Sequence, residues 1–162
     1  MVNIALVSVR IQFLKLLLAL VLSILPVTSL CAADSVRPVN KDEAGIAIKG
    51  FDPVAYFAES RAVKGKKEFE HLYEESRWRF SSAAYRDLFA ANPERYMPQY
   101  GGFCAGGMIA GRLVSADPEA WKIIDGKLFL GYSKAASDKF SKDADKNIKE
   151  ADQQWIRVRG QH

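Results

Sequence analysis

Aromatic side chains recur at every second position in two runs within residues 68–82. A period of two is typical of a β-strand, in which neighbouring side chains point to opposite faces. Two such runs in succession predict an antiparallel hairpin with one apolar face. The side chains expected on that face are Phe69, His71 and Tyr73 from the first strand and Trp78 and Phe80 from the second.

A second hairpin is predicted further along the chain, where Ile124 and Leu128 flank the segment Asp125-Gly126-Lys127. Asp-Gly between apolar runs is a strong signal for a tight turn that joins two strands. Near the start of the domain, Ile46 and Ile48 alternate in the same way and predict one short strand.

Short helices are predicted from their start signals. Asp52-Pro53 and Asp117-Pro118 each indicate a helix start, because aspartate can accept hydrogen bonds from free N–H groups and proline fits the first turn. Ser81 or Ser82 is expected to cap a further helix, which is predicted over residues 83–96.

Near the C-terminus, apolar residues recur at helical spacing on an otherwise charged stretch, which predicts one amphipathic helix packed on the core. These residues are Ala136, Phe140, Ala144, Ile148, Ala151 and Trp155. Apart from the two Asp-Pro pairs, we expect no internal repeat. Short strands and helices in mixed order predict an α+β fold: a small single domain with antiparallel hairpins, several short helices and a C-terminal amphipathic helix.

The N-terminal segment has the three-part pattern of a secretory signal. It starts with an apolar stretch whose only charges are Arg10 and Lys15, continues in the apolar run 16–25, and ends in small residues near Ala33. The run is shorter than the roughly 20 residues that span a membrane. We therefore expect residues 1–33 to be cleaved and the protein to be exported, periplasmic or secreted, with an uncleaved anchor as the alternative.

The remaining chain is expected to divide into a flexible lead-in over residues 34–44, a domain over residues 45–156 and a tail over residues 157–162. Loss of residues 1–33 removes Arg10 and Lys15 and lowers the formal net charge from +4 to +2. The other basic residues are interleaved with acidic ones and form no basic stripe, so nucleic acid is not an expected partner. Membrane contact is expected only through an uncleaved N-terminal segment, and the residues predict no oligomeric state.

After cleavage a single cysteine remains, Cys104, within the glycine-rich segment YGGFCAGGM at residues 100–108. With one cysteine the domain has no internal disulfide and folds by burial alone. Glycines let a backbone or ligand approach closely, and free N–H groups in such a turn would stabilise a thiolate. The segment therefore indicates a thiol or soft-metal site. The alternative is an inert buried cysteine that packs as a small apolar residue.

The soft-metal interpretation has four candidate ligands, which are Cys104, Met108, His71 and Met97 in falling order of expectation after the cysteine. Cys104 and Met108 are four residues apart and would share one face of a helical turn. Thiolate and thioether sulfurs favour Cu(I), while thiolate with imidazole also suits Zn. For the two methionines, the alternative is that they fill gaps in the core.

Three stretches of the chain resemble the secreted YHS-domain proteins: GFDPVAYF, WRFSSAAYRDLFAANPERYMPQYGGFCA and DPEAWKIIDGKLFLGYSK. The resemblance covers residues 45–155, and it implies a fold similar to treble-clef-like, metal-handling modules. Ser81 and Tyr85 stand where metal-type members of the wider family have cysteines, so that ligand set does not carry over. In the secreted subgroup, the position of Cys104 is selenocysteine in some members, which implies that this chalcogen is employed.

Three functions remain open at this point. The first is a copper-type soft-metal module in which Cys104 is the main ligand. The second is a thiol oxidoreductase in which Cys104 is the nucleophile, activated by backbone N–H groups or His71 and reset by a small thiol or an oxidant. The third is a non-catalytic ligand- or protein-binding module with a structural cysteine. No familiar catalytic motif is present, which favours a protein that is not an enzyme.

Overall fold

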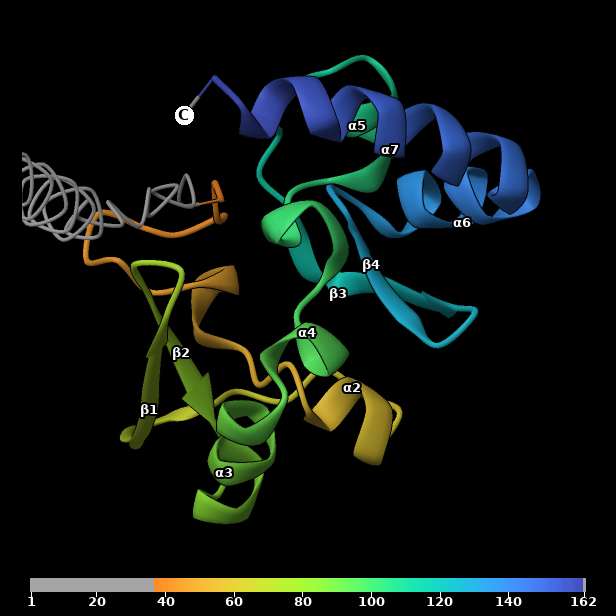
Figure 1. The fold of residues 1–162 in the computed structure, drawn as a ribbon. Helices are drawn as coiled ribbons and strands as arrows, with labels where there is room; N and C mark the ends of the chain where they lie inside the picture. The colour runs from red at the N-terminus through yellow and green to blue at the C-terminus, as the bar shows by residue number, and fades with distance from the viewer. Residues whose placement is uncertain (1–36, 162) are drawn as a thin grey trace, which may run out of the picture. The chain divides into compact units, whose positions relative to one another are not determined.

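The computed structural model describes residues 37–161, and the predicted signal segment lies outside them. The described residues form the predicted α+β domain, with two antiparallel hairpins and six α-helices (Figure 1). In chain order the elements are η1 (Ile48–Gly50), α2 (Ala55–Ala58), β1 (Lys66–Tyr73), β2 (Ser76–Phe80), α3 (Ala83–Ala91), α4 (Pro93–Tyr96), η2 (Gln99–Gly102), α5 (Ala105–Ile109), β3 (Asp117–Ile124), β4 (Lys127–Gly131), α6 (Lys134–Lys142) and α7 (Ala144–Arg159), where η marks a 3-10 turn.

The first hairpin forms as predicted. Strands β1 and β2 pair antiparallel with His71 opposite Trp78. The chain reverses at Glu74 and Glu75, whose φ angles of 47° and 49° are those of a tight two-residue hairpin turn. Trp78 and Phe80 are fully buried, so β2 carries the apolar face of this hairpin.

Helix α3 packs against the buried face of the hairpin. It begins at Ser82, whose side-chain oxygen accepts a hydrogen bond from the N–H of Tyr85 at 3.2 Å. Phe89 near its end is fully buried, and its ring centroid lies 5.3 Å from that of Trp78 and 5.1 Å from that of Phe80. The serine cap and this one phenylalanine therefore fix where the helix starts and which face it buries.

The succession of elements occurs twice along the chain. The elements η1, β1, β2, α3 and α4 begin at residues 48, 66, 76, 83 and 93. The elements η2, β3, β4, α6 and α7 each begin 51 residues later, at 99, 117, 127, 134 and 144. The ladders repeat as well, because β3 pairs with β4 antiparallel and shows the same register shift as β1 with β2. Residues 48–96 and 99–159 are thus a first and a second repeat, and the expectation of no internal repeat is wrong.

Few side chains are common to the two repeats, which is why the sequence hides them. Ser133 caps α6 as Ser82 caps α3, with the same 3.2 Å hydrogen bond to the third helical residue. Phe140 occupies the buried place of Phe89. Most other positions carry different side chains that fill similar space, so the backbone pattern is repeated with little identity.

The two Asp-Pro pairs have different structures. Asp52 caps α2 as predicted, since its Oδ1 accepts hydrogen bonds from the N–H groups of Val54 and Ala55 at 2.9 and 3.3 Å. Asp117 begins strand β3, so the helix start predicted at Asp117-Pro118 is wrong. Asp117 pairs with Gly131 across the ladder, and proline is tolerated at the start of a strand, where its missing N–H breaks no ladder bond.

The C-terminal apolar stripe lies on two helices, so the prediction of one continuous helix needs correction. Asp143 separates α6 from α7 and has a non-helical backbone, with φ −124° and ψ 54°. The Asn147 side chain donates to the carbonyl of Phe140 at 2.9 Å and so satisfies an acceptor at the end of α6. Phe140, Ile148 and Trp155 still belong to one apolar cluster, as the helical spacing predicts.

The start of the described chain is built from turns and bridges. Ile46 makes one isolated parallel bridge to Arg77, whereas Ile48 begins η1 with a φ of 41°. The short strand predicted over these residues is therefore reduced to a single bridge, because the chain turns there toward α2. Upstream, the N–H of Asn40 donates to the carbonyl of Gly101 at 2.9 Å and ties the lead-in to the second repeat.

Two apolar clusters hold the domain together, and strand β4 contributes to both. The first cluster contains Trp78, Phe80 and Phe89 of the first repeat together with Leu128 and Leu130 of β4. The second cluster, which contains Phe129 between those two leucines, lies within the second repeat. Alternate side chains of a strand point to opposite faces, so β4 joins the two halves of the core.

Phe89→Ala is predicted to lower the free energy of unfolding by about 3–5 kcal/mol, because it leaves a cavity among the aromatic rings of the first cluster. The neighbouring change Leu88→Ala is the matched control, since the Leu88 side chain is 46% exposed on the same helix. That change should cost less than about 1 kcal/mol. Urea unfolding followed by tryptophan fluorescence measures both, and equal losses would contradict the assignment of Phe89 as the residue that seals the hairpin.

Candidate functional site

Cys104 lies at the junction of η2 and α5, and its side chain is completely buried. Its N–H donates to the carbonyl of Val114 at 2.8 Å, and its own carbonyl accepts from the N–H of Met108 at 3.1 Å. It also makes an isolated bridge to Leu130 of β4. Although Cys104 occupies the N-cap position of α5, its side chain makes no capping hydrogen bond. The sulfur is therefore held in the core and closed off from solvent.

In the first repeat, the place of Cys104 is taken by a buried aspartate. The N–H of Asp52 donates to the carbonyl of Val63 at 2.8 Å, as that of Cys104 donates to Val114, which is 51 residues after Val63. The Asp52 carboxylate accepts four hydrogen bonds, two of them from the N–H and hydroxyl of Ser81 at 2.7 and 2.8 Å. Cys104 thus stands where the first repeat uses a structural cap at the start of its short helix.

The other three predicted ligands are distributed over the core. Met108 follows Cys104 by one helical turn, as predicted, and is fully buried in the second cluster. Met97 is buried in the first cluster. The ring of His71 packs edge-on against Phe89 with centroids 6.0 Å apart. Within residues 37–161, no three side chains of His, Cys, Asp or Glu gather as they would around a metal ion. The copper-type site stays a prediction.

The buried tyrosines use their hydroxyl groups within the protein. The Tyr56 hydroxyl donates to the carbonyl of Pro118 at 2.8 Å, and the Tyr100 hydroxyl donates to the Asp152 carboxylate at 2.9 Å. Burial raises the pKa of both phenols, and in Tyr100 the hydrogen bond to Asp152 raises it further. Both groups stay protonated at neutral pH and act as links between elements.

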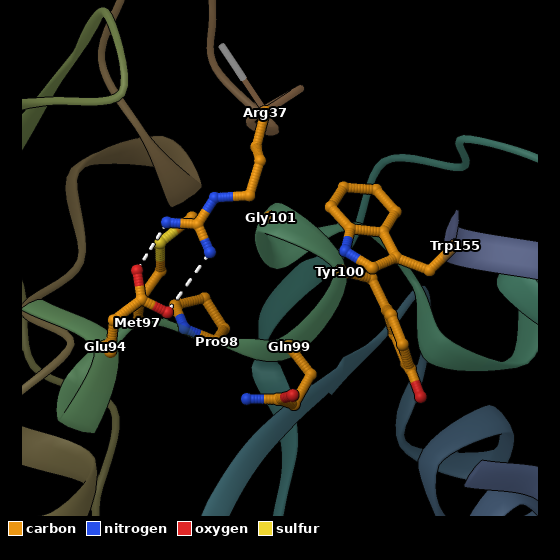
Figure 2. Close-up of a pocket in the computed structure, with 8 residues that line it drawn as sticks. All are labelled: Arg37, Glu94, Met97, Pro98, Gln99, Tyr100, Gly101 and Trp155. Carbon is orange, nitrogen blue, oxygen red and sulfur yellow. Dashed lines mark hydrogen bonds and ion pairs between the residues drawn. The ribbon is translucent and has the colours of Figure 1, made fainter. Parts of the chain in front are cut away.

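A small pocket lies where the lead-in crosses the loop before η2. Figure 2 shows the Arg37 side chain extending to Glu94, with which it makes two hydrogen bonds, while Tyr100 and Trp155 lie on the other side of the pocket. Its volume of about 60 Å³ suits a few water molecules. Arg37 also pairs with Glu74 at 2.7 Å, so this network fastens the lead-in to the β1–β2 turn and to α4.

A much larger groove lies between α5, α6 and the start of α7, and its volume is about 1020 Å³. Its walls are small and apolar residues with a rim of charged and amide side chains. The lining residues are Gly106, Ile109, Ala110, Tyr132, Ala135, Ala136, Asp138, Lys139, Phe140, Lys142, Asp143 and Asn147. Gly106 connects this groove to Cys104, since a Cβ at Gly106 would contact the cysteine Sγ at 3.9 Å.

Sequence reasoning missed this groove because its walls are defined by what is absent. Alanine and glycine are unremarkable in a short helix, and no single residue among them signals a ligand. The only available signal was the spacing of Gly106 and Ala110 on one segment and Ala135 and Ala136 on another. That spacing gains meaning only when the fold brings α5 and α6 together.

Comparisons with family models, with curated proteins and with solved structures found no match. The resemblance to secreted YHS-domain proteins therefore stays a prediction. In residues 37–161, no helix has both the length and the apolar character needed to cross a membrane.

Glu94→Gln is predicted to lower stability at pH 7 and to have little effect at low pH. The hydrogen bond from Arg37 lowers the pKa of Glu94 against the opposing effect of burial. A carboxyl group whose pKa is lowered by folding stabilises the fold above its unfolded pKa of about 4.3, and this contribution is lost as the pH falls through the folded value. Because Glu94 is 59% exposed, we expect about 0.5–1 kcal/mol at pH 7.

Urea unfolding of wild type and Glu94→Gln at pH 7 and at about pH 3 measures this difference. Glu68→Gln, which changes an exposed glutamate on β1, is the control and should be neutral at both pH values. A loss of stability in Glu94→Gln that is as large in acid as at neutral pH would show that the ion pair is not its cause.

Proposed function

We propose that this protein is a small, non-catalytic binding module in which Cys104 is a structural residue and the groove between α5 and α6 holds the ligand. The proposal takes up the third alternative above. With the export signal predicted in residues 1–33, the module would act in the periplasm or outside the cell.

The observation that carries the proposal is the complete burial of the Cys104 side chain. A nucleophilic thiolate must meet its substrate, and reactive cysteines are accordingly at least partly exposed. The imidazole that could activate Cys104 belongs to His71, which packs on Phe89 in the first cluster. Burial beside a helix start, in the place where the first repeat has the capping Asp52, supports a packing role for the sulfur.

The groove supports the binding half of the proposal. Ligand sites are concave, largely apolar and typically about 300–1,000 Å³ in volume, with a few polar groups that orient the ligand. The groove has this size, an apolar wall from Ile109 and Phe140, and lysine and amide groups at its rim. Tyr132 at its edge is 62% exposed and offers an aromatic face that has no structural task in the core.

The native protein is predicted to protect Cys104 from thiol reagents. Iodoacetamide should label Cys104 at least about 100-fold more slowly in buffer than in guanidinium chloride, because the burial of the sulfur leaves reaction only through opening of the fold. Peptide mass spectrometry separates this label from any on Cys31, which serves as the internal control for a thiol outside the described domain.

The Cys104→Ala variant completes the test. It should fold and give the same amide NMR spectrum for the groove residues, with at most about 2 kcal/mol of lost stability. Rapid labelling of native Cys104, or its oxidation by peroxide at the rate of a free thiol, would contradict the proposal and favour the thiol oxidoreductase. Stoichiometric Cu(I) binding that is lost in Cys104→Ser would favour the soft-metal module instead.

A further inference from the structure

The groove in the second repeat corresponds to a space that the first repeat fills with its own side chains. Tyr85 is the third residue after the capping Ser82 on α3, and Ala136 is the third residue after the capping Ser133 on α6. The N–H of each donates to its serine Oγ at 3.2 Å, so the two backbone positions are equivalent. A tyrosine in one repeat is thus an alanine in the other.

The partner of that tyrosine has been replaced as well. Glu59 ends α2 in the first repeat, and Ala110 ends α5 in the second, 51 residues later. In the first repeat the Tyr85 side chain packs on the core, and its hydroxyl group hydrogen-bonds to Glu59, which together raise the pKa of the phenol. The ring therefore bridges α3 and the end of α2.

In the second repeat, both members of this pair are alanines, and both line the groove. The space beside α6 and the end of α5 is therefore open where the corresponding space in the first repeat holds a phenol ring. From this correspondence we infer that the groove binds a small aromatic molecule that carries an anionic group. The inference rests on the proposed function and names the class of its ligand.

The charge of the ligand follows from a second set of replacements. Leu88 and Ala91 of α3 correspond to Lys139 and Lys142 of α6, and both lysines line the groove. Neither lysine belongs to an ion pair within residues 37–161. The acidic Asp138 nearby is already paired with Lys122 at 2.8 Å.

The groove lining also contains Asp143, so its charges are two lysines against two aspartates. Pairing of Asp138 with Lys122 leaves an excess of one positive charge at the rim. The carboxylate of Glu59, which would repel an anion, has no counterpart because Ala110 stands in its place. An aromatic ring bearing a carboxylate or sulfonate can place the ring beside Ala136 and the anionic group near Lys139 and Lys142.

The experiment is a titration of the full, isotope-labelled chain with naphthalene-2-carboxylate, followed by amide NMR shifts. We expect saturable shifts confined to α5, α6 and the start of α7. Two analogues separate the parts of the inference: cyclohexanecarboxylate lacks the aromatic ring, and naphthalene-2-methanol lacks the charge. Both should bind at least fivefold more weakly than the naphthoate.

Ala136→Tyr restores the side chain of the first repeat at the same helical position and should weaken naphthoate binding at least tenfold. Ala90→Tyr is the matched control, because it places a tyrosine at an exposed position of α3 and should change affinity less than twofold. Should Ala136→Tyr fail to fold, Ala110→Glu at an exposed position tests the same space and should also weaken binding at least tenfold. Lys139→Leu should remove most of the preference for the carboxylate over the alcohol.

Each of three results would overturn the inference: no saturable binding, shifts outside the groove, or affinity unchanged in both Ala136→Tyr and Ala110→Glu. Equal affinity for the carboxylate and the alcohol would overturn the assignment of an anionic ligand. None of these results bears on the accessibility of Cys104, so protected cysteine together with absent naphthoate binding would reject this ligand class while leaving the proposed function in place.

Discussion

The domain depends on one kind of packing, in which a serine-capped helix presses a single phenylalanine onto the apolar face of a two-stranded hairpin. An isolated hairpin is at best marginally stable, because one face of its side chains remains in water. In each repeat the helix after the hairpin removes that face from water, with Phe89 in the first and Phe140 in the second. The serine cap sets the first turn of the helix, so it also decides which residue reaches the hairpin.

The two repeats share this construction and differ in how they treat the space beside it. The first repeat fills the junction of its two short helices with Tyr85 and closes the start of α2 with the four hydrogen bonds of Asp52. The second repeat has Cys104 in the place of the aspartate and alanines in the place of the tyrosine and its partner. Its polar groups have moved from the interior of the junction to the rim of the groove, where a ligand can reach them.

Sequence reasoning predicts the local elements of this domain well, because hairpin and cap signals act within a few residues. The alternation of Trp78 and Phe80, the Asp125-Gly126 turn and the Ser82 cap each determine a nearby feature, and each has its predicted structure. Asp117-Pro118 misleads because the same dipeptide is compatible with a helix start and a strand start. What decides is the pairing of Asp117 with Gly131, a contact that no local pattern contains.

The same limit applies to the candidate site. The residue types of Cys104, Met108, Met97 and His71 are correctly recognised as soft ligands, but their separation into two core clusters follows from strand pairing and helix packing. The groove arises from small residues on α5 and α6, which are far apart in the sequence. The repeat itself is visible as a constant spacing of elements, and the identities that could have announced it are chiefly a serine cap and a buried phenylalanine.

The second repeat has the means to remain folded with an open groove. Its last helix, α7 (Ala144–Arg159), is four turns long, whereas the corresponding α4 (Pro93–Tyr96) is a single turn. Helix α7 packs along α5 and adds Ile148, Ala151 and Trp155 to the second cluster (Figure 1). Apolar burial that the first repeat gains partly from Tyr85 is thus supplied in the second repeat by a long helix on the other side of α5. Since stability does not require the groove to be filled, its small side chains are free to serve a ligand.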